Sequence, residues 1–514
     1  MKKFFLVFFL SIKFIFANNF TPSLYITYDS ISTSKYTEAT FEFIDAQNHP
    51  TGFKATGNFK EKGFIRIRGN STATAPKKPF NIKFDKKINI LGMGKSKKWV
   101  LLSNPFDPAL IRNKLIFDLA SKFSFEFTPK SYFVDVWTNG VFMGNYQLAQ
   151  KIEFSTNRIN YNIERGDFLF ERVTTRTKKG VFYFYSPLDS IRIALNEPEQ
   201  PTEEQLKDLS EKLFDIETAI ATKNINEYLR YVDLQTMIDY YWIEEFVNDP
   251  DLHTGSIYFT IHNGVLRGGP VWDFDLALGN TKSATKAKTT GLNAKDIWWM
   301  NLFQDSAFEK LANERYLELA PYFENMAKDN ELGGNQIDSL LLYFQDSFDR
   351  NFSDSGWAYC DSNATNDEVV RHLTCPYNQQ PAPSFDENIE KLKEWIIDRN
   401  EYLKSKAKAS LKELDSIKVT LKEILEKQNF IFKAIDSIAV ADSIKRADSL
   451  SNTKPQPNII PILSRNSKPF NLDKKTHLYL KKGNRTTILQ TKREGILVKG
   501  TKTQSNTSKV IIQK

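Results

Sequence analysis

Two short acidic clusters are the residues of this sequence best suited to chemistry. Asp273 and Asp275 lie one residue apart in the segment that begins at Gly269, so on an extended chain both carboxylates point to the same side. Asp249 and Asp251 flank a proline at the predicted end of a helix. Carboxylate oxygens of this kind suit a hard cation such as Mg²⁺, which would position a reacting group. The competing interpretation is a simple turn and the solvated end of a strand.

A basic cluster lies nearer the amino terminus. Arg66 and Arg68 share one face of a predicted strand, and the turn Gly69-Asn-Ser-Thr72 follows them. Lys78 and Lys83 lie shortly downstream. Guanidinium groups bind phosphate oxygens through paired hydrogen bonds, and ammonium groups bind them as point charges. A basic and an acidic cluster in one chain are typical of metal-dependent phosphoryl transfer, whereas arginines that pair with acids across a sheet are the alternative.

Other catalytic classes lack support in the sequence. Gly92-Met-Gly-Lys-Ser96 is similar to part of a phosphate-binding loop, but Asn89 stands where that loop requires its first glycine. The five histidines have no spacing typical of zinc ligands, and there is no Gly-x-Ser-x-Gly motif. The sequence therefore argues against zinc hydrolases and serine hydrolases.

The elements that must position these clusters begin with strands. Residues 18–162 contain several segments in which apolar and polar side chains alternate, the period of half-buried strands. Asn139-Gly140 predicts a hairpin, because this pair accepts the positive φ angles of a type I′ turn. One helix is predicted to interrupt the strands, with Asp107 as its cap, running to about Lys122.

Helices dominate the next part of the chain, from about residue 201 to 409. They are predicted at 202–222, 233–247, 301–326 and 337–348, with a pair of strands at 256–261 and 265–273. The sequence thus predicts an α+β fold with a strand-rich N-terminal part and a helical C-terminal part.

The C-terminal region has a different character. Residues 385–446 predict one long, charge-rich helix, and we interpret 413–453 as a helical stalk and linker. Residues 454–514 form a basic tail, whose end predicts a small β-rich module.

Composition and charge narrow the class of protein. The chain of 514 residues is 41% hydrophobic and 26% charged, which is typical of globular proteins. The net charge of +8 is uneven, because residues 451–514 contain 14 Lys and Arg against two acids, or +12, and the rest of the chain is slightly acidic. The high pI therefore describes the tail, and we expect no nucleic-acid partner. A basic tail suits contact with anionic cell-surface polymers.

The amino terminus predicts export. Met1-Lys-Lys3 is followed by an apolar stretch that ends at Ala17, so we interpret residues 1–17 as a signal peptide; a buried or membrane-anchoring segment is the alternative. No later apolar run approaches the ~20 residues that span a bilayer, so no integral membrane segment is expected after signal removal. In an oxidising compartment Cys360 and Cys375 are expected to form a disulfide, and two free thiols are the alternative.

Several motifs occur in the same order as in a known family. The chain resembles the spore coat protein H (CotH) kinase family in Ile65–Thr72, Pro76–Phe80, Leu91–Met93, Lys98–Leu102, Leu110–Leu115, Asn139–Gly144, Lys151–Glu153, Asn248–Asp251 and Gly269–Asp275. The resemblance extends over roughly residues 20–405 and implies an atypical protein-kinase-like fold for residues 18–412. It also implies ATP and Mg²⁺ as cofactors, bound between the strand-rich and helical parts.

The resemblance assigns roles to individual residues. Asp251 matches the candidate catalytic aspartate, which orients the acceptor hydroxyl. Asp273 matches the metal-binding aspartate. The resemblance also implies that Ser256 and Asp275 bind the metal. For the nucleotide it implies Arg68, Lys78, Lys83 and Glu153, and Glu153 would orient a lysine. Asp249 departs from the family pattern, where Asn is common; an acid there would strengthen metal binding or raise a neighbouring pKa.

These observations lead to two functional expectations. The first is an exported Mg²⁺- and ATP-dependent protein kinase that transfers the γ-phosphoryl group to Ser or Thr hydroxyls of exported or surface proteins. The second is a catalytically inactive, kinase-like adhesion or scaffold protein of the cell surface. The tail is similar to the end of type IX secretion sorting domains in Glu494–Lys499 and Ser508–Lys514, which implies passage through an outer membrane.

Overall fold

A computed structural model describes residues 20–174, 177, 180–294, 297–354, 357–358, 371–372, 382–451, 477–482, 485–492 and 495–503. The predicted signal peptide and the predicted disulfide between Cys360 and Cys375 lie outside these residues. Within them, strands dominate the N-terminal part and helices follow, so the α+β class predicted from the sequence is confirmed.

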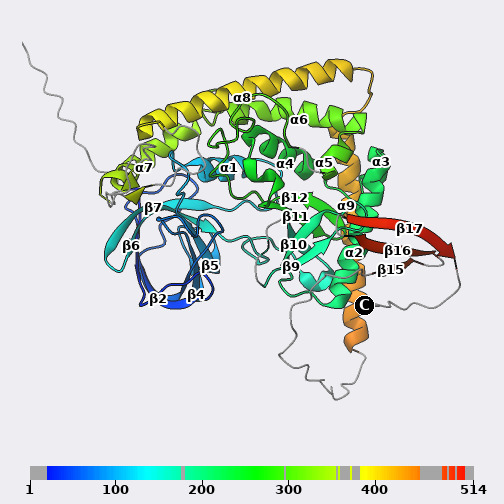
Figure 1. Ribbon diagram of the computed structural model, residues 1–514, viewed down its shortest axis with the longest axis horizontal. Coiled ribbons are helices and arrows are strands. Elements are labelled where there is room, and N and C mark those ends of the chain that lie inside the picture. Colours follow the sequence, from blue (N-terminus) through cyan, green and yellow to red (C-terminus); the bar gives the residue numbers. More distant parts are fainter. Residues whose placement is uncertain are drawn as a thin grey trace, which may run out of the picture.

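The N-terminal strands close into a barrel (Figure 1). The barrel order is β1-β2-β3-β4-β5-β7-β6, and the parallel pairing of β1 with β6 closes it. Aromatic side chains such as Phe41, Phe43 and Phe84 fill its interior, because alternate residues of each strand face inward. The bounds are β1 Ser23–Thr27, β2 Thr37–Ile44, β3 Phe59–Ile67, β4 Phe80–Asn89, β5 Lys95–Leu102, β6 Ser131–Thr138 and β7 Val141–Gln150.

Two local predictions in the barrel region have different outcomes. Asn139 and Gly140 join β6 to β7 with φ angles of 50° and 81°, which confirms the predicted hairpin. Helix α1 spans Arg112–Ala120, so the prediction that Asp107 caps it is wrong. The carboxylate of Asp107 instead accepts hydrogen bonds from the backbone N–H groups of Ala109 and Arg112, which stabilises a turn before the helix.

A second sheet lies beside the barrel (Figure 1). Its order is β12-β11-β8-β10-β9, all antiparallel, with β8 Phe168–Arg172, β9 Phe182–Tyr185, β10 Arg192–Glu197, β11 Ile257–His262 and β12 Val265–Gly268. The strand predicted at 265–273 is too long. It ends at Gly268, because Pro270 has no N–H group to donate to a ladder and Gly269 has a φ of 92°.

Helices pack on this sheet, on the barrel and on one another. Their bounds are α2 Glu203–Ala221, α3 Ile225–Tyr228, α4 Leu234–Val247, α5 Ile297–Leu302, α6 Ser306–Glu324, α7 Gln336–Ser353, α8 Phe385–Glu413 and α9 Leu421–Ser451, with short 3-10 helices at Ile163–Arg165 and Pro250–His253. Helix α4 is buried along almost its whole length. The helix predicted at 301–326 is two helices, because Asp305 caps α6 by accepting the N–H of Ala307.

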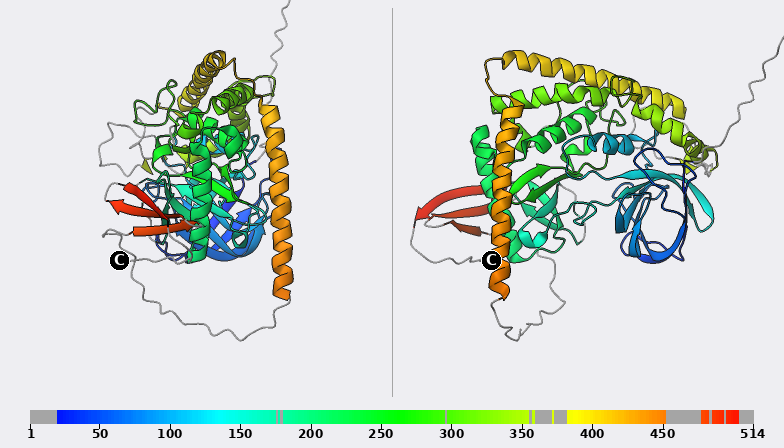
Figure 2. Two further views of the ribbon diagram at one scale, coloured as in Figure 1. Left: turned by 90° about the vertical axis from the view of Figure 1, so that its right-hand side faces the viewer. Right: turned by 180° about the vertical axis from the view of Figure 1, so that it is seen from behind.

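The long helix predicted at 385–446 is also two helices, α8 and α9. Helix α8 lies along α6, as Figure 1 shows, and α9 runs down the edge of the molecule (Figure 2). The first turns of α9 bury Leu421, Ile424 and Gln428, and the Gln428 amide donates to the carbonyl oxygens of Leu229 and Val232. The beginning of the predicted stalk therefore packs against the body of the protein.

Small strands complete the described elements. Residues of the tail form an antiparallel sheet of β15 His477–Lys482, β16 Arg485–Lys492 and β17 Gly495–Thr503, and the short strands β13 Trp357–Ala358 and β14 Arg371–His372 pair in parallel. Across the described residues, no helix combines the length and the apolar character that crossing a membrane requires.

Candidate functional site

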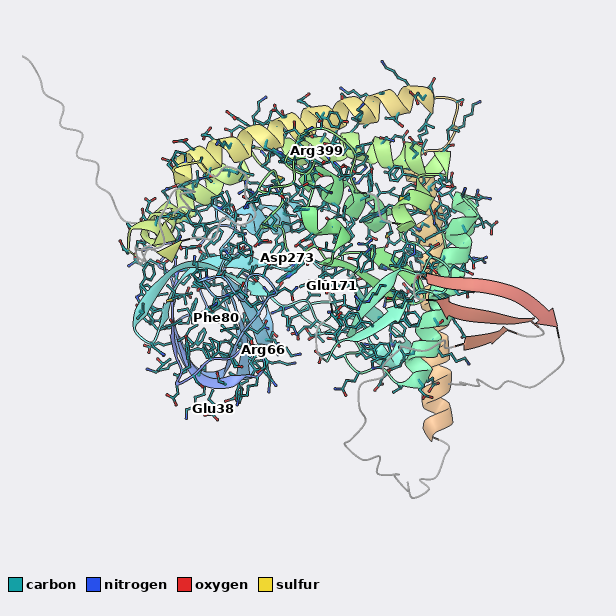
Figure 3. All side chains as sticks on the ribbon, viewed as in Figure 1. Glu38, Arg66, Phe80, Glu171, Asp273 and Arg399 are labelled. Atoms are coloured by element: carbon teal, nitrogen blue, oxygen red, sulfur yellow. The ribbon has the colours of Figure 1, made fainter. Side chains whose placement is uncertain are left out.

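Residues of both acidic clusters and of the basic turn line one hollow. The barrel contributes the turn after β3, the second sheet contributes β8 and the start of β11, and the segments after α4 and β12 contribute the acids. Figure 3 labels two of the lining residues, Asp273 and Glu171, between the barrel and the second sheet. The charged and hydroxyl-bearing residues that line the hollow are Arg68, Ser71, Thr72, Glu171, Asp251, Ser256, Tyr258, Asp273 and Asp275.

The end of helix α4 positions Asp251. Asn248 ends the helix in the left-handed region, with a φ of 51°, and Asp249 then begins the 3-10 helix that contains Asp251. Asp249 Oδ1 accepts the N–H of Asp251 at 2.9 Å, and the Thr254 hydroxyl donates to Asp251 Oδ1 at 3.0 Å. The carboxylate of Asp251 is therefore held at the hollow by its own turn.

Ser256 and Asp273 form a second, directly bonded pair. The Ser256 hydroxyl donates to Asp273 Oδ2 at 2.9 Å, and the Ser256 N–H donates to Glu171 Oε1 at 2.7 Å. Both residues have left-handed backbones, with φ angles of 67° and 75°. Such conformations are costly outside glycine and are concentrated at functional sites, where the surrounding structure imposes them. Tyr258 also hydrogen-bonds Glu171, so β8 and β11 support this side of the hollow.

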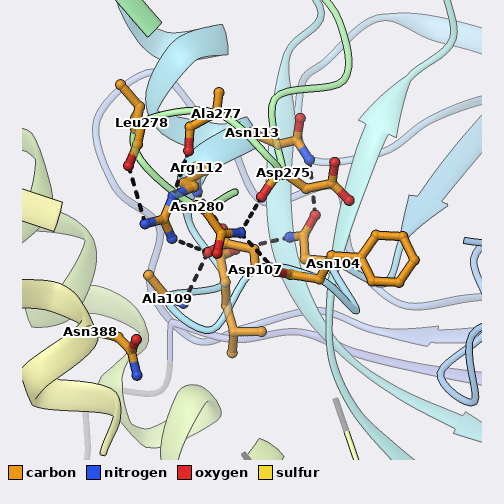
Figure 4. A network of polar contacts seen from close by, with 12 residues as sticks. Asn104, Asp107, Ala109, Arg112, Asn113, Asp275, Ala277, Leu278, Asn280 and Asn388 are labelled. Carbon is orange, nitrogen blue, oxygen red and sulfur yellow. Dashed lines mark hydrogen bonds and ion pairs between the residues drawn. The ribbon is translucent and has the colours of Figure 1, made fainter. Parts of the chain in front are cut away.

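The segment that carries Asp275 is held by the region around α1 (Figure 4). The N–H of Phe274 donates to Asn113 Oδ1 at 2.7 Å, and Arg112 Nε donates to the carbonyl oxygen of Ala277 at 3.0 Å. Arg112 is itself paired with Asp107. The prediction that Asp273 and Asp275 share one side of an extended strand is wrong, because this segment is irregular, yet both residues line the same hollow.

Negative charge is concentrated here. Burial raises the pKa of Asp275 well above its usual range, and the charges of Asp273 and Asp251 add to this effect. Burial likewise raises the pKa of Asp249, followed by the charges of Asp251 and Glu244. Several carboxylates in one low-dielectric region repel each other unless a cation or proton is added. The site therefore favours positively charged ligands.

Arg68 supplies positive charge to the same hollow. Burial lowers the pKa of its guanidinium, whereas the charges of Asp273 and Asp275 act in the opposite direction. The guanidinium carbon lies 5.4 Å from the ring centroid of Trp272. Arg68 is thus fixed between an aromatic ring and the acids, with the nearby turn Gly69–Thr72 beside it.

The donor chemistry of the site fits Mg²⁺. Carboxylate and hydroxyl oxygens from Asp273, Ser256 and Asp275 are the ligand types that hard cations take, and the buried Oδ2 of Asp249 has no hydrogen-bond partner among the described residues. In that same part of the chain, no group of three or more His, Cys, Asp or Glu side chains is already arranged around a metal position. Binding would therefore require these carboxylates to turn toward the cation.

Three residues assigned to the nucleotide by sequence do not line the hollow. Lys78 donates to the carbonyl oxygen of Ala73 at 3.0 Å, and Lys83 is exposed on β4. Glu153 is buried and pairs with Lys98 at 3.2 Å. The family resemblance implied that Glu153 orients a lysine, but no role was predicted for Lys98 from the sequence.

Charged side chains link this pair to the hollow. Arg66 lies over the ring of Tyr36 at 4.7 Å, and the charges of Arg66, Lys98 and Glu153 all act on the Tyr36 hydroxyl. The charge of Arg66 also acts on Arg68. Basic groups therefore continue from the hollow toward Lys98. Lys98 belonged to a motif of the resemblance, whereas Glu171 and Tyr258 had no signal in the sequence.

Two comparisons with known proteins bear on the family of this chain. A comparison with curated proteins found no match. The family model described as CotH kinase protein matches residues 65–403, which is most of the chain and contains every residue named in this subsection except Tyr36. The chain therefore belongs to the CotH kinase family.

Proposed function

We propose that the protein is an exported Mg²⁺- and ATP-dependent protein kinase that phosphorylates Ser or Thr hydroxyls of exported or surface proteins. Family membership supports a kinase-like phosphotransferase. The observation that carries the proposal is that Arg68, Asp251 and Asp273, from three distant parts of the chain, line one hollow. Export rests on the N-terminal signal predicted from the sequence.

The proposed roles follow from chemistry and position. When bound, Mg²⁺ neutralises charge on the nucleotide phosphates. Asp273 would hold it with Ser256 and Asp275. Asp251 would accept a hydrogen bond from the acceptor hydroxyl and take its proton at a carboxylate oxygen. The acceptor oxygen then bonds to the γ-phosphorus as the bond to the β-phosphate oxygen breaks, and Arg68 binds phosphate oxygens during this transfer.

Lys98, paired with Glu153, is our candidate for the lysine that contacts the nucleotide phosphates. A buried carboxylate 3.2 Å from the ammonium group orients it, and the Ser96 hydroxyl also donates to Glu153, at 3.1 Å. We therefore assign to Lys98 the role that the sequence gave to Lys78 or Lys83. The charge of Arg66, which acts both on Arg68 and, together with Lys98, on Tyr36, supports this assignment.

An inactive scaffold or adhesion protein is the second candidate. Tyr25 and Trp137 stack on the barrel strands with centroids 4.7 Å apart, and Trp137 packs on Phe142 at the same distance. Tyr25 is 39% exposed. Exposed, stacked aromatic rings are suited to contact with other molecules, and this surface does not require a working phosphoryl-transfer site.

The test is thermal unfolding of the full chain with and without ATP and Mg²⁺. Ligand at 100 times its dissociation constant stabilises the native state by about 2.7 kcal/mol. We expect this shift in the wild type and in the control Asp29→Ala, which changes an exposed carboxylate. Asp273→Ala should abolish it, and Asp251→Ala should retain nucleotide binding but lose transfer of labelled phosphate from ATP to dephosphorylated casein.

The outcome separates the two candidates. An unchanged ligand shift and unchanged transfer in Asp273→Ala would refute the kinase assignment. A wild-type protein without any ligand shift would favour the scaffold.

A further inference from the structure

A group of buried polar atoms lies at the end of α4, just before Asp251 in the chain. The atoms that are almost wholly inaccessible and have no hydrogen-bond partner within the described residues include both carboxylate oxygens of Glu244, Asn248 Oδ1, Asp249 Oδ2 and Lys286 Nζ. Glu244 and Asp249 are each only 1% exposed. Buried polar groups are rarely left without compensation, and a buried charge is retained only where an opposite charge is near.

The loop that carries Lys286 is fixed against the end of α4. Asn248 Nδ2 donates to the carbonyl oxygens of Thr285, Lys286 and Lys288 at 3.4, 3.0 and 3.2 Å. Trp395 of α8 donates to the carbonyl oxygen of Ala287 at 2.8 Å. The backbone is therefore held on both sides, so the Lys286 side chain is directed to this place by structure.

Most of the charges around Lys286 are opposite to its own. Burial lowers the pKa of Lys286, whereas the charges of Asp249, Glu245 and Glu244, in that order, act in the opposite direction, and the charge of Arg399 lowers it further. Burial raises the pKa of Glu244 to about 8, and the charge of Lys286 acts against this rise. Glu245 has other partners, because it pairs with Arg399 at 2.7 Å and accepts the N–H groups of Asn293 and Ala294. Asp249 and Glu244 are the carboxylates whose oxygens are left without a partner in this part of the described chain.

The two carboxylate oxygens of Asp249 have different surroundings. Its Oδ1 accepts the N–H of Asp251 at 2.9 Å, and its Oδ2 is one of the buried atoms without a partner. Any charge that stabilises ionised Asp249 therefore also stabilises the turn that presents Asp251.

We infer that Lys286 is a positioning residue, the internal counter-cation of Asp249 and Glu244, which keeps the turn of Asp251 in place. Its ammonium group supplies the positive charge behind the turn, so that a divalent cation is required only on the side of Asp273. The second part of this inference rests on the proposed function; the first part does not.

A charge-coupling cycle on the full chain tests the first part. Lys286→Met should lower the melting temperature, because it leaves two buried carboxylates uncompensated. Combining it with Asp249→Asn or Glu244→Gln should restore part of the loss, and Lys286→Arg should lose less than Lys286→Met. Lys288→Met, which changes an exposed lysine in the same loop, is the matched control and should have little effect. Double variants no more stable than Lys286→Met would overturn the inference.

Calorimetric titration with Mg²⁺ alone tests the second part. Lys286→Met removes one positive charge that acts on Asp249, so we expect Mg²⁺ to bind about tenfold more tightly. Lys288→Met should leave the affinity nearly unchanged, and a purely structural role for Lys286 would not tighten binding. Equal affinity in the wild type and Lys286→Met would overturn this part. A wild type that binds no Mg²⁺ with or without ATP would instead overturn the proposed function, and the stability cycle alone would then decide the role of Lys286.

Discussion

Because Lys77 is buried, we expect the folding stability of the protein to depend on pH in an unusual way. It lies just before β4 and is fully buried, and its Nζ donates to the carbonyl oxygen of Asn145 at 2.5 Å and to Asn351 Oδ1 at 2.6 Å. Burial lowers the pKa of Lys77 to about 7, although the negative charge of Asp135 acts in the opposite direction. This side chain connects the barrel with α7, so its protonation state affects how these two parts hold together.

The sign and the magnitude follow from proton linkage. In the unfolded chain Lys77 has the ordinary lysine pKa of about 10.4 and binds its proton throughout the neutral range. Between about pH 7 and pH 10 the unfolded state therefore binds more protons than the folded state, and stability rises with pH at up to about 1.4 kcal/mol per unit. Integrated from pH 7 to pH 9, the lowered pKa gives a gain of about 2 kcal/mol.

Equilibrium urea unfolding at several pH values measures this effect. The quantity to compare is the free energy of unfolding of the wild type minus that of Lys77→Met, because other titrating groups cancel in the difference. We expect this difference to grow in favour of the wild type by about 2 kcal/mol between pH 7 and pH 9. Lys83→Met, which changes an exposed lysine on the neighbouring strand, should show no such trend.

One outcome would refute the lowered pKa of Lys77. If the stability of the wild type and of Lys77→Met changes in parallel with pH, Lys77 is protonated in the folded state across this range. The hydrogen bonds to Asn145 and Asn351, together with Asp135, would then compensate its buried charge fully.

Three substitutions test the packing that supports the site, each by urea unfolding. Arg399→Met should cost about 3–5 kcal/mol, because it leaves Glu245 without its buried ion-pair partner, and a loss below 1 kcal/mol would contradict that role. Thr202→Ala should cost about 1 kcal/mol through loss of the capping box of α2, whereas Thr202→Ser should be nearly neutral. Gly268→Ala should cost about 1–3 kcal/mol, since a Cβ would lie 2.9 Å from that of Tyr240; wild-type stability would show that α4 yields easily.

Much of the local structure could be predicted from the sequence. The alternation within strands, the Asn139-Gly140 hairpin and the helices predicted at 202–222 and 233–247 depend on neighbours in the chain, so a short window contains the necessary information. Some boundaries were predicted wrongly although a local signal marks them, such as Pro270 after β12 and Asp305 before α6. The start of α9 at Leu421 is another such boundary, because the Thr420 hydroxyl accepts the N–H of Glu423. Its first turns also pack on the segment around Leu229, a contact that the sequence does not reveal.

The candidate site divides in the same way. Residue types and motif order identified Arg68, Asp251 and Asp273, because metal and phosphate binding demand particular side chains. Their approach to one hollow was decided by tertiary structure, since β3, the end of α4 and the segment after β12 are far apart in sequence. Residues with structural partners but no motif of their own, such as Glu171, could be found only in the folded chain.

The sequence by itself determined the order of the elements, the α+β class, the charged tail and the family. Only the tertiary structure decided that the barrel closes, because β1 pairs with β6 across more than a hundred residues of chain. It also decided that Glu153 pairs with Lys98 and that the charges of Asp249 and Glu244 act on Lys286. The physical reason is that burial and long-range pairing set the charge and position of these groups, and neither property can be read from a residue and its neighbours along the chain.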